Sequence, residues 1–97
     1  AVRALVMQAA KAVDLNTPDA DALCNMAKVF ASEEILKVCQ NAMELHGGMG
    51  SMLEAGIEKL VRDASIFLHM DATVDISNFK IIKALWPENA GKYAGPE

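Results

Sequence analysis

The longest patterned stretch of the sequence is PDADALCNMAKVFASEEILKVCQNAMEL, residues 18–45. At 1.5 Å per residue, a helix over this stretch would be about 42 Å long. A helix of that length with one wide apolar stripe needs other long helices to cover it, so the stretch predicts an all-α fold. Apolar side chains recur in it at steps of three and four residues, the period of an amphipathic helix: Ala20, Leu23, Ala27, Phe30, Ala31, Ile35, Val38, Ala42 and Leu45.

Three further helices are predicted around this one, and no segment shows the period of two that a strand requires. The first covers residues 1–15 and the last covers residues 74–85. The helix between them begins near residue 51 and carries apolar positions up to residue 68. Because consecutive helices joined by short connections are antiparallel neighbours, we predict an up-down four-helix bundle over residues 1–86. Residues 87–97 are predicted to be a flexible tail.

Local signals predict where these helices begin and which sides they bury. Thr17 is expected to cap the long helix. The pattern Ser51-Met52-Leu53-Glu54 fits a capping box for the third helix. In the fourth helix the inward positions are expected to be Ile76, Phe79, Ile82 and Leu85.

The composition excludes several classes of protein. A net charge of −4, with only nine Lys and Arg residues, does not suit a nucleic-acid-binding face. Although 53% of the residues are hydrophobic, no apolar run reaches the roughly 18 residues that a membrane span needs. No signal peptide is visible, so a soluble protein in the cytoplasm is the default expectation. The chain opens in the middle of a helical pattern without Met, and we therefore expect it to be part of a longer protein.

The two cysteines, Cys24 and Cys39, are predicted to lie on the same helix. Their fifteen-residue separation corresponds to about 22 Å along it, too far for a disulfide or a shared metal ion. We expect two buried or half-buried free thiols in a reducing compartment.

Two loops carry candidate chemistry. Residues 44–50 form a glycine-rich turn before a helix, which suits either close approach to a phosphate or a plain structural turn. Residues 69–76 place the carboxylate of Asp71 beside the hydroxyl of Thr73, which suits either a helix cap or an anion site. His46 and His69 have no third ligand in view, so no metal site is predicted. Arg62 and Asp63 are expected to form a structural ion pair or a tie between helices.

Four blocks of the sequence follow one another at a characteristic spacing: KVFASE at 28–33, LHGGMG at 45–50, IEKLVRDA at 57–64 and DATVDI at 71–76. Taken together and in this order, they resemble the C-terminal domain of the acyl-CoA dehydrogenase family. The resemblance covers nearly all of residues 1–86. It implies that a helical domain and a β-barrel precede this segment, that FAD is the cofactor, and that an acyl-CoA is the substrate.

The resemblance implies roles for the residues of the second loop. Asp71 takes the place of the catalytic base, where the family usually has Glu, and its side chain is shorter by about 1.5 Å. Family members that oxidise nitroalkanes or cyclic acyl-CoAs also use Asp. Ala72 replaces the usual glycine beside the thioester. Thr73, Val74 and Asp75 match the segment that contacts the cofactor.

The first loop resembles the segment that reaches the adenine half of a neighbouring subunit's FAD. It contains Glu44, where the family commonly has Gln, and His46, Gly47 and Gly48. The resemblance further implies a homodimer or homotetramer, an electron-transfer acceptor that is itself a flavoprotein, and a mitochondrial matrix location in a eukaryote. Two alternatives remain at this point: a non-catalytic helical association module, and a family member with oxidase chemistry.

Overall fold

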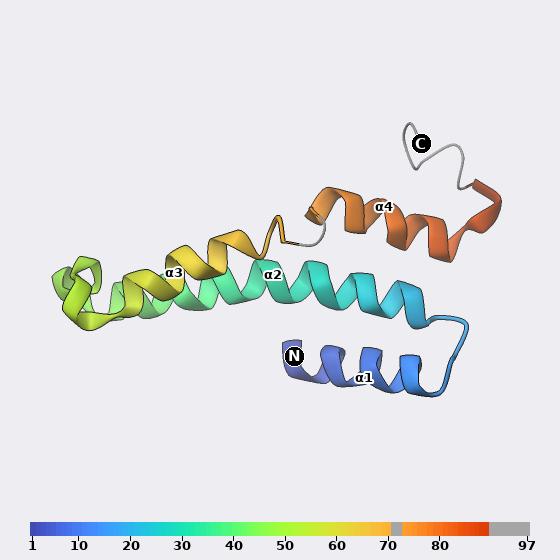
Figure 1. Ribbon diagram of the computed structural model, residues 1–97, viewed down its shortest axis with the longest axis horizontal. Helices are drawn as coiled ribbons and strands as arrows, with labels where there is room; N and C mark the ends of the chain where they lie inside the picture. Colours follow the sequence, from blue (N-terminus) through green and yellow to red (C-terminus); the bar gives the residue numbers. More distant parts are fainter. Residues whose placement is uncertain (71–72, 90–97) are drawn as a thin grey trace.

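The computed structural model describes residues 1–70 and 73–89, and the described part is built from four α-helices (Figure 1). It contains no strand within those residues, so the predicted all-α class is confirmed. The helices are α1 (Val2–Asp14), α2 (Ala20–Leu45), α3 (Ile57–Ile66) and α4 (Val74–Leu85). Three short 3₁₀ helices complete the order: η1 (Gly47–Ser51) and η2 (Leu53–Ala55) lie between α2 and α3, and η3 (Pro87–Asn89) follows α4.

Helix α2 is the axis on which the other three helices pack. α1, α3 and α4 each contact α2, but in the described part of the chain their backbones do not closely approach one another. Figure 1 shows α1 and α4 flanking the N-terminal half of α2, with α3 along its C-terminal half. The first two connections reverse the chain direction, whereas α3 and α4 follow each other in the same direction along α2. The result is an elongated, thin molecule of 52 × 32 × 17 Å.

The buried side chains of the domain are small, which lets the helix backbones come close. Apart from Ile57, the apolar core consists of alanines, and the buried polar residues are Ser32 and Ser77. Large apolar side chains remain partly exposed, up to 89% for Leu45 at the end of α2. The described domain therefore has a thin core and extensive apolar surface. The core alanines are Ala9, Ala12, Ala22, Ala27 and Ala64.

The prediction of which face of α4 points inward is wrong, because the helix is rotated about its axis relative to the predicted orientation. Ile76 and Phe79 are 48% and 43% exposed, whereas Ser77 is 1% exposed. One residue corresponds to about 100° of rotation in an α-helix. The contact with α2 selects the face that carries the small Ser77, because a small side chain permits closer packing than the bulky isoleucine and phenylalanine that sequence reasoning chose.

Two predicted helix starts are also wrong. The residue that precedes α2 is Asp19, and the Thr17 hydroxyl donates to the Asp19 carboxylate at 2.6 Å instead of capping the helix. Ser51 donates to the Gly48 carbonyl at 3.0 Å within η1, so it does not form a capping box with Glu54. α3 begins only after Gly56, whose φ of 77° is left-handed and interrupts the helical path.

The two thiols lie in α2, as predicted, and both are free. Cys39 is half-buried, but Cys24 is exposed, contrary to expectation. None of the helices in the described ranges is both long and apolar enough to cross a membrane.

Ser77 offers a test of the α2–α4 contact, since its buried Oγ has no hydrogen-bond partner among the described residues. We expect Ser77→Ala to raise the free energy of unfolding by about 1 kcal/mol, because an unsatisfied buried hydroxyl is removed. Ser77→Val should lower it by about 1–3 kcal/mol, because added bulk separates the helices. Urea unfolding of the protein measures both. A loss of stability in Ser77→Ala would show that the hydroxyl has a partner.

Candidate functional site

The break between α3 and α4 is held together by local hydrogen bonds. The Thr73 Oγ1 accepts from the Ile76 backbone N at 3.1 Å and so caps α4, which confirms the capping role foreseen for this hydroxyl. The Val74 backbone N donates to the Leu68 carbonyl at 3.2 Å and ties the two sides of the break. A hydroxyl that accepts one hydrogen bond still has a proton to donate, and this hydroxyl lies at the positive end of a helix. Thr73 can therefore bind an anion.

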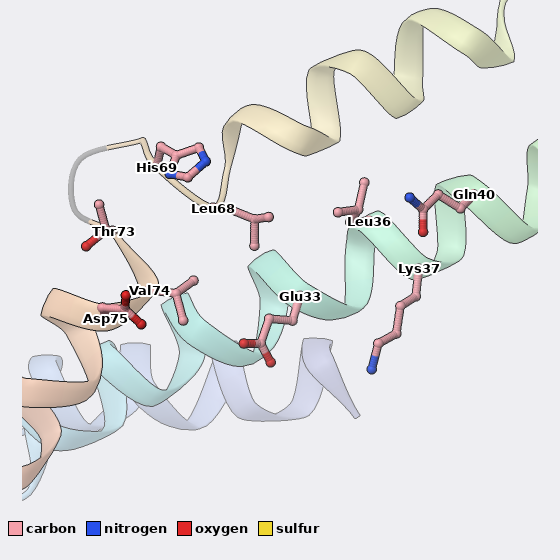
Figure 2. Close-up of a pocket in the computed structure, with 9 residues that line it drawn as sticks. All are labelled: Glu33, Leu36, Lys37, Gln40, Leu68, His69, Thr73, Val74 and Asp75. Atoms are coloured by element: carbon pink, nitrogen blue, oxygen red, sulfur yellow. The ribbon is translucent and has the colours of Figure 1, made fainter.

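A hollow of about 580 Å³ lies between this break and α2 (Figure 2). The predicted cofactor-contacting residues Thr73, Val74 and Asp75 all line it. Leu68 from the break and Leu36 from α2 point toward each other across it. The predicted base, Asp71, and its neighbour Ala72 lie outside the described residues. The remaining lining residues are Glu33, Lys37, Gln40 and His69.

A second hollow, of about 470 Å³, lies beside the glycine-rich turn. It brings together the predicted residues Glu44 and Gly47, the latter with φ of 61°. His46 and Gly48 are exposed and do not line this hollow. Instead, the His46 Nδ1 lies 2.8 Å from the Ala42 carbonyl at the end of α2. The other lining residues are Gln40, Asn41, Met43 and Ser51.

One polar stripe of α2 links the two hollows. Glu33, Lys37, Gln40 and Glu44 are spaced by four, three and four residues, which places them on one side of the helix. Gln40 lines both hollows. The stripe spans about 16 Å from residue 33 to residue 44. Lys37 and Gln40 were not among the predicted site residues, although counting back from Glu44 at helical spacing leads to both.

The expected pair between Arg62 and Asp63 is not formed. Arg62 instead holds Glu58 through two hydrogen bonds of 2.7 and 3.1 Å, and Lys59 pairs with Asp63 at 2.8 Å. Each pair spans one turn of α3, because side chains four residues apart share a helix face and adjacent ones do not. The hydrogen bonds that Arg62 donates to the Glu58 carboxylate raise the pKa of the Arg62 guanidinium. These contacts stabilise α3 locally. In the described ranges, no group of three or more His, Cys, Asp or Glu side chains gathers to hold a metal ion.

Comparison with known proteins identifies the domain. Residues 1–85 match the family described as acyl-CoA dehydrogenase, C-terminal domain. The chain belongs to this family. No solved structure gives a significant match to it.

Relatives of this acyl-CoA dehydrogenase C-terminal domain are much longer proteins. Mitochondrial isobutyryl-CoA dehydrogenase of Bos taurus is 31% identical over 91% of the chain and 21% of the relative. Subunit CarC of the caffeyl-CoA reductase–Etf complex of Acetobacterium woodii is 33% identical over 84% of the chain and 21% of its own length. The 3-(aryl)acrylate reductase of Clostridium sporogenes is 32% identical over 88% of the chain and 22% of its own length. The chain thus spans about a fifth of these relatives.

Gly50 is a structural residue of the glycine turn that sequence reasoning did not single out. It is buried, and a Cβ added there would lie 2.4 Å from the Met43 carbonyl oxygen, whereas a Cβ on Gly48 would meet nothing within 4 Å. In this acyl-CoA dehydrogenase domain, Gly50→Ala should therefore lower the free energy of unfolding by about 1–3 kcal/mol. The matched control Gly48→Ala should change it by less than about 0.5 kcal/mol. Equal effects in denaturant unfolding would contradict the close approach of the turn to α2.

Proposed function

We propose that the whole protein is a FAD-dependent oxidoreductase that dehydrogenates an acyl-CoA thioester between Cα and Cβ. Family membership supports this reaction class. The observation that carries the proposal is the geometry at Thr73, whose hydroxyl caps α4 beside a hollow, two residues after a carboxylate in the sequence. An anion-binding helix start and an acid are thus brought to one short segment.

In this proposal Asp71 removes the α-proton of the thioester. FAD, when bound, supplies the acceptor for the hydride that leaves the β-carbon. A thioester α-proton is a far weaker acid than a carboxylic acid, so the transfer needs exclusion of water and hydrogen bonds to the carbonyl oxygen. The apolar side chains of Leu36 and Leu68 line the hollow and help to exclude water. Ala72 is proposed to lie beside the thioester.

The residues around both hollows fit parts of FAD. Thr73 and the start of α4 suit a phosphate oxygen, because the hydroxyl proton and the helix dipole both favour an anion there. The glycine turn is open on its outer side, with nothing within 4 Å of a Cβ built on Gly47 or Gly48. Glu44 suits ribose hydroxyls, which donate to a carboxylate, better than it suits a phosphate. We propose that His46 and Asp75 belong to the same cofactor-contacting segments.

Catalysis in the opposite direction is the second candidate function. Two relatives are a caffeyl-CoA reductase subunit and an arylacrylate reductase. The same groups would serve this chain in reverse: protonated Asp71 would deliver its proton to the α-carbon of an unsaturated thioester, while the hydride for the β-carbon would come from reduced FAD. Comparing the rate of flavin reduction by saturated acyl-CoAs with the rate of reduced-flavin oxidation by α,β-unsaturated acyl-CoAs distinguishes the two directions.

The remaining proposals concern partners and location. An electron-transfer flavoprotein is the proposed redox partner, consistent with the Etf complex to which one relative belongs. The exposed apolar side chains support assembly into a homodimer or homotetramer. Cytoplasm, or the mitochondrial matrix in a eukaryote, is the proposed location; the bovine relative is a mitochondrial protein.

Substitution of the proposed base tests the reaction. We expect Asp71→Asn in the full-length protein to reduce acyl-CoA-dependent bleaching of the flavin to a slow residual rate while FAD stays bound, because the amide cannot accept the α-proton. Asp63→Asn, which changes an exposed helical ion pair, is the control and should bleach at the wild-type rate. Near wild-type bleaching by Asp71→Asn would remove this residue from the role, and a colourless full-length protein would overturn the flavoenzyme proposal.

Replacing Glu44 tests the placement of its carboxylate. If it meets ribose hydroxyls, Glu44→Gln should weaken FAD binding by about two- to tenfold, because a charge-assisted hydrogen bond becomes a neutral one. Glu88→Gln, at an exposed position after α4, is the matched control. Fluorescence titration of the apoprotein with FAD gives both dissociation constants. Tighter binding by Glu44→Gln would instead indicate that the carboxylate lies beside a phosphate.

A further inference from the structure

The carbonyl of Phe67, the residue that directly follows α3, is bound by two side chains from α2. The Phe67 carbonyl accepts hydrogen bonds from the Lys28 ammonium and from the Ser32 hydroxyl, the latter at 3.1 Å. Lys28 also donates to the Ser32 Oγ at 3.0 Å, so the three groups close a triangle. We call Lys28, Ser32 and the Phe67 carbonyl the α3 clamp. It joins residues that are 39 and 35 positions apart in the chain.

The clamp places a cation at the C-terminal end of α3, where the helix itself supplies none. The final carbonyls of a helix lack intrahelical partners, and the C-terminal end carries partial negative charge. The last turn of α3 contains no basic residue, so the cation comes from α2 instead. Ser32 is only 4% exposed, and its buried hydroxyl is satisfied entirely by the clamp. The clamp is therefore a specific polar contact within an otherwise alanine-rich interface.

The clamp holds the N-terminal end of the break between α3 and α4, and a second set of hydrogen bonds holds its C-terminal end. Phe67 is held to α2, and the next residue, Leu68, accepts from the Val74 backbone N at 3.2 Å. Thr73 then caps α4. In the sequence, position 71 lies between these two anchors.

We propose that Lys28 and Ser32 are positioning residues that set the register of the α3–α4 break and thereby the reach of the base. This inference rests on the proposed function. Lys28 and Ser32 line a separate hollow of about 350 Å³, and neither Thr73 nor Asp75 is among the residues that line it. They act on the chemistry through the Phe67 carbonyl, not by contact with the residues that cap α4. A base shorter than glutamate depends more strongly on such positioning, because a misplacement of about 1 Å costs on the order of a hundredfold in rate.

The test uses full-length protein with FAD bound and two variants, Ser32→Ala and Lys28→Met. Each keeps most of the packing volume and removes one donor of the clamp. We expect the rate of flavin reduction at saturating acyl-CoA to fall about ten- to a hundredfold, with FAD content, melting temperature and KM near wild type. Lys28→Arg, which keeps a charged donor, should retain more of the rate than Lys28→Met.

Matched controls separate the clamp from general effects of serine and lysine replacement. Ser65→Ala removes a hydroxyl that donates to the Val61 carbonyl at 2.9 Å inside α3, with no link to α2. Lys59→Met removes an ammonium that pairs only with Asp63 in the same helix. Both controls should reduce flavin at the wild-type rate.

Combination with Asp71→Asn distinguishes positioning of the base from damage elsewhere. If the clamp acts through position 71, adding Ser32→Ala to Asp71→Asn should lower the residual rate by less than about twofold. The inference would be overturned if the rate losses of Ser32→Ala and Asp71→Asn multiplied in full in the double variant. It would also be overturned if the rate loss were accompanied by loss of FAD or by a lowered melting temperature. Wild-type rates in both clamp variants, with Asp71→Asn slowed to its residual rate, would reject the clamp alone. Wild-type bleaching by Asp71→Asn would instead reject the proposed role of Asp71 as the base, on which this inference rests.

Discussion

Close packing against a single helix is the constraint on which the rest of this domain depends. α1, α3 and α4 each pack on α2, and within the described residues their backbones do not closely approach one another. The contacts use alanines, serines and one glycine, whose small size brings backbones together. A face of this kind tolerates little added volume, because interiors are already packed to high density. The positions of both turns are therefore set by how α3 and α4 seat on α2.

Polar groups at the helix ends fix the position of α3 and α4 along α2. Small apolar contacts alone would let α3 slide along α2, since they contain no specific geometry. The α3 clamp, the cap at Thr73 and the backbone bond from Val74 to Leu68 have defined donors and acceptors. Such bonds contribute modestly to net stability but are costly to leave unmade when buried. They fix the register at the break that carries the proposed chemistry.

Predictions from the sequence were accurate where the interacting residues lie close together in the chain, and less accurate where packing between distant segments decides the outcome. The cap at Thr73 was predictable because it joins residues three apart in the chain. The capping box at Ser51 failed because Gly56 interrupts the helix, and the hydroxyl bonds within η1 instead. The inward face of α4 failed because hydrophobicity favours Ile76 and Phe79, whereas helix approach favours Ser77. Of the predicted cofactor residues, Glu44, Gly47, Thr73, Val74 and Asp75 line the two hollows, but His46 and Gly48 do not.

The sequence alone determined the all-α class, the long central helix, the two turns with their candidate residues and the resemblance to the acyl-CoA dehydrogenase family. Each depends on periodicity or on groups close together in the chain, which the order of residues records directly. Only the tertiary structure decided that Lys28 and Ser32 bind the Phe67 carbonyl, that Gln40 lines both hollows and that Ser77 is buried. These features arise when segments distant in sequence pack together, and their rotation and separation are set by side-chain volumes on both partners.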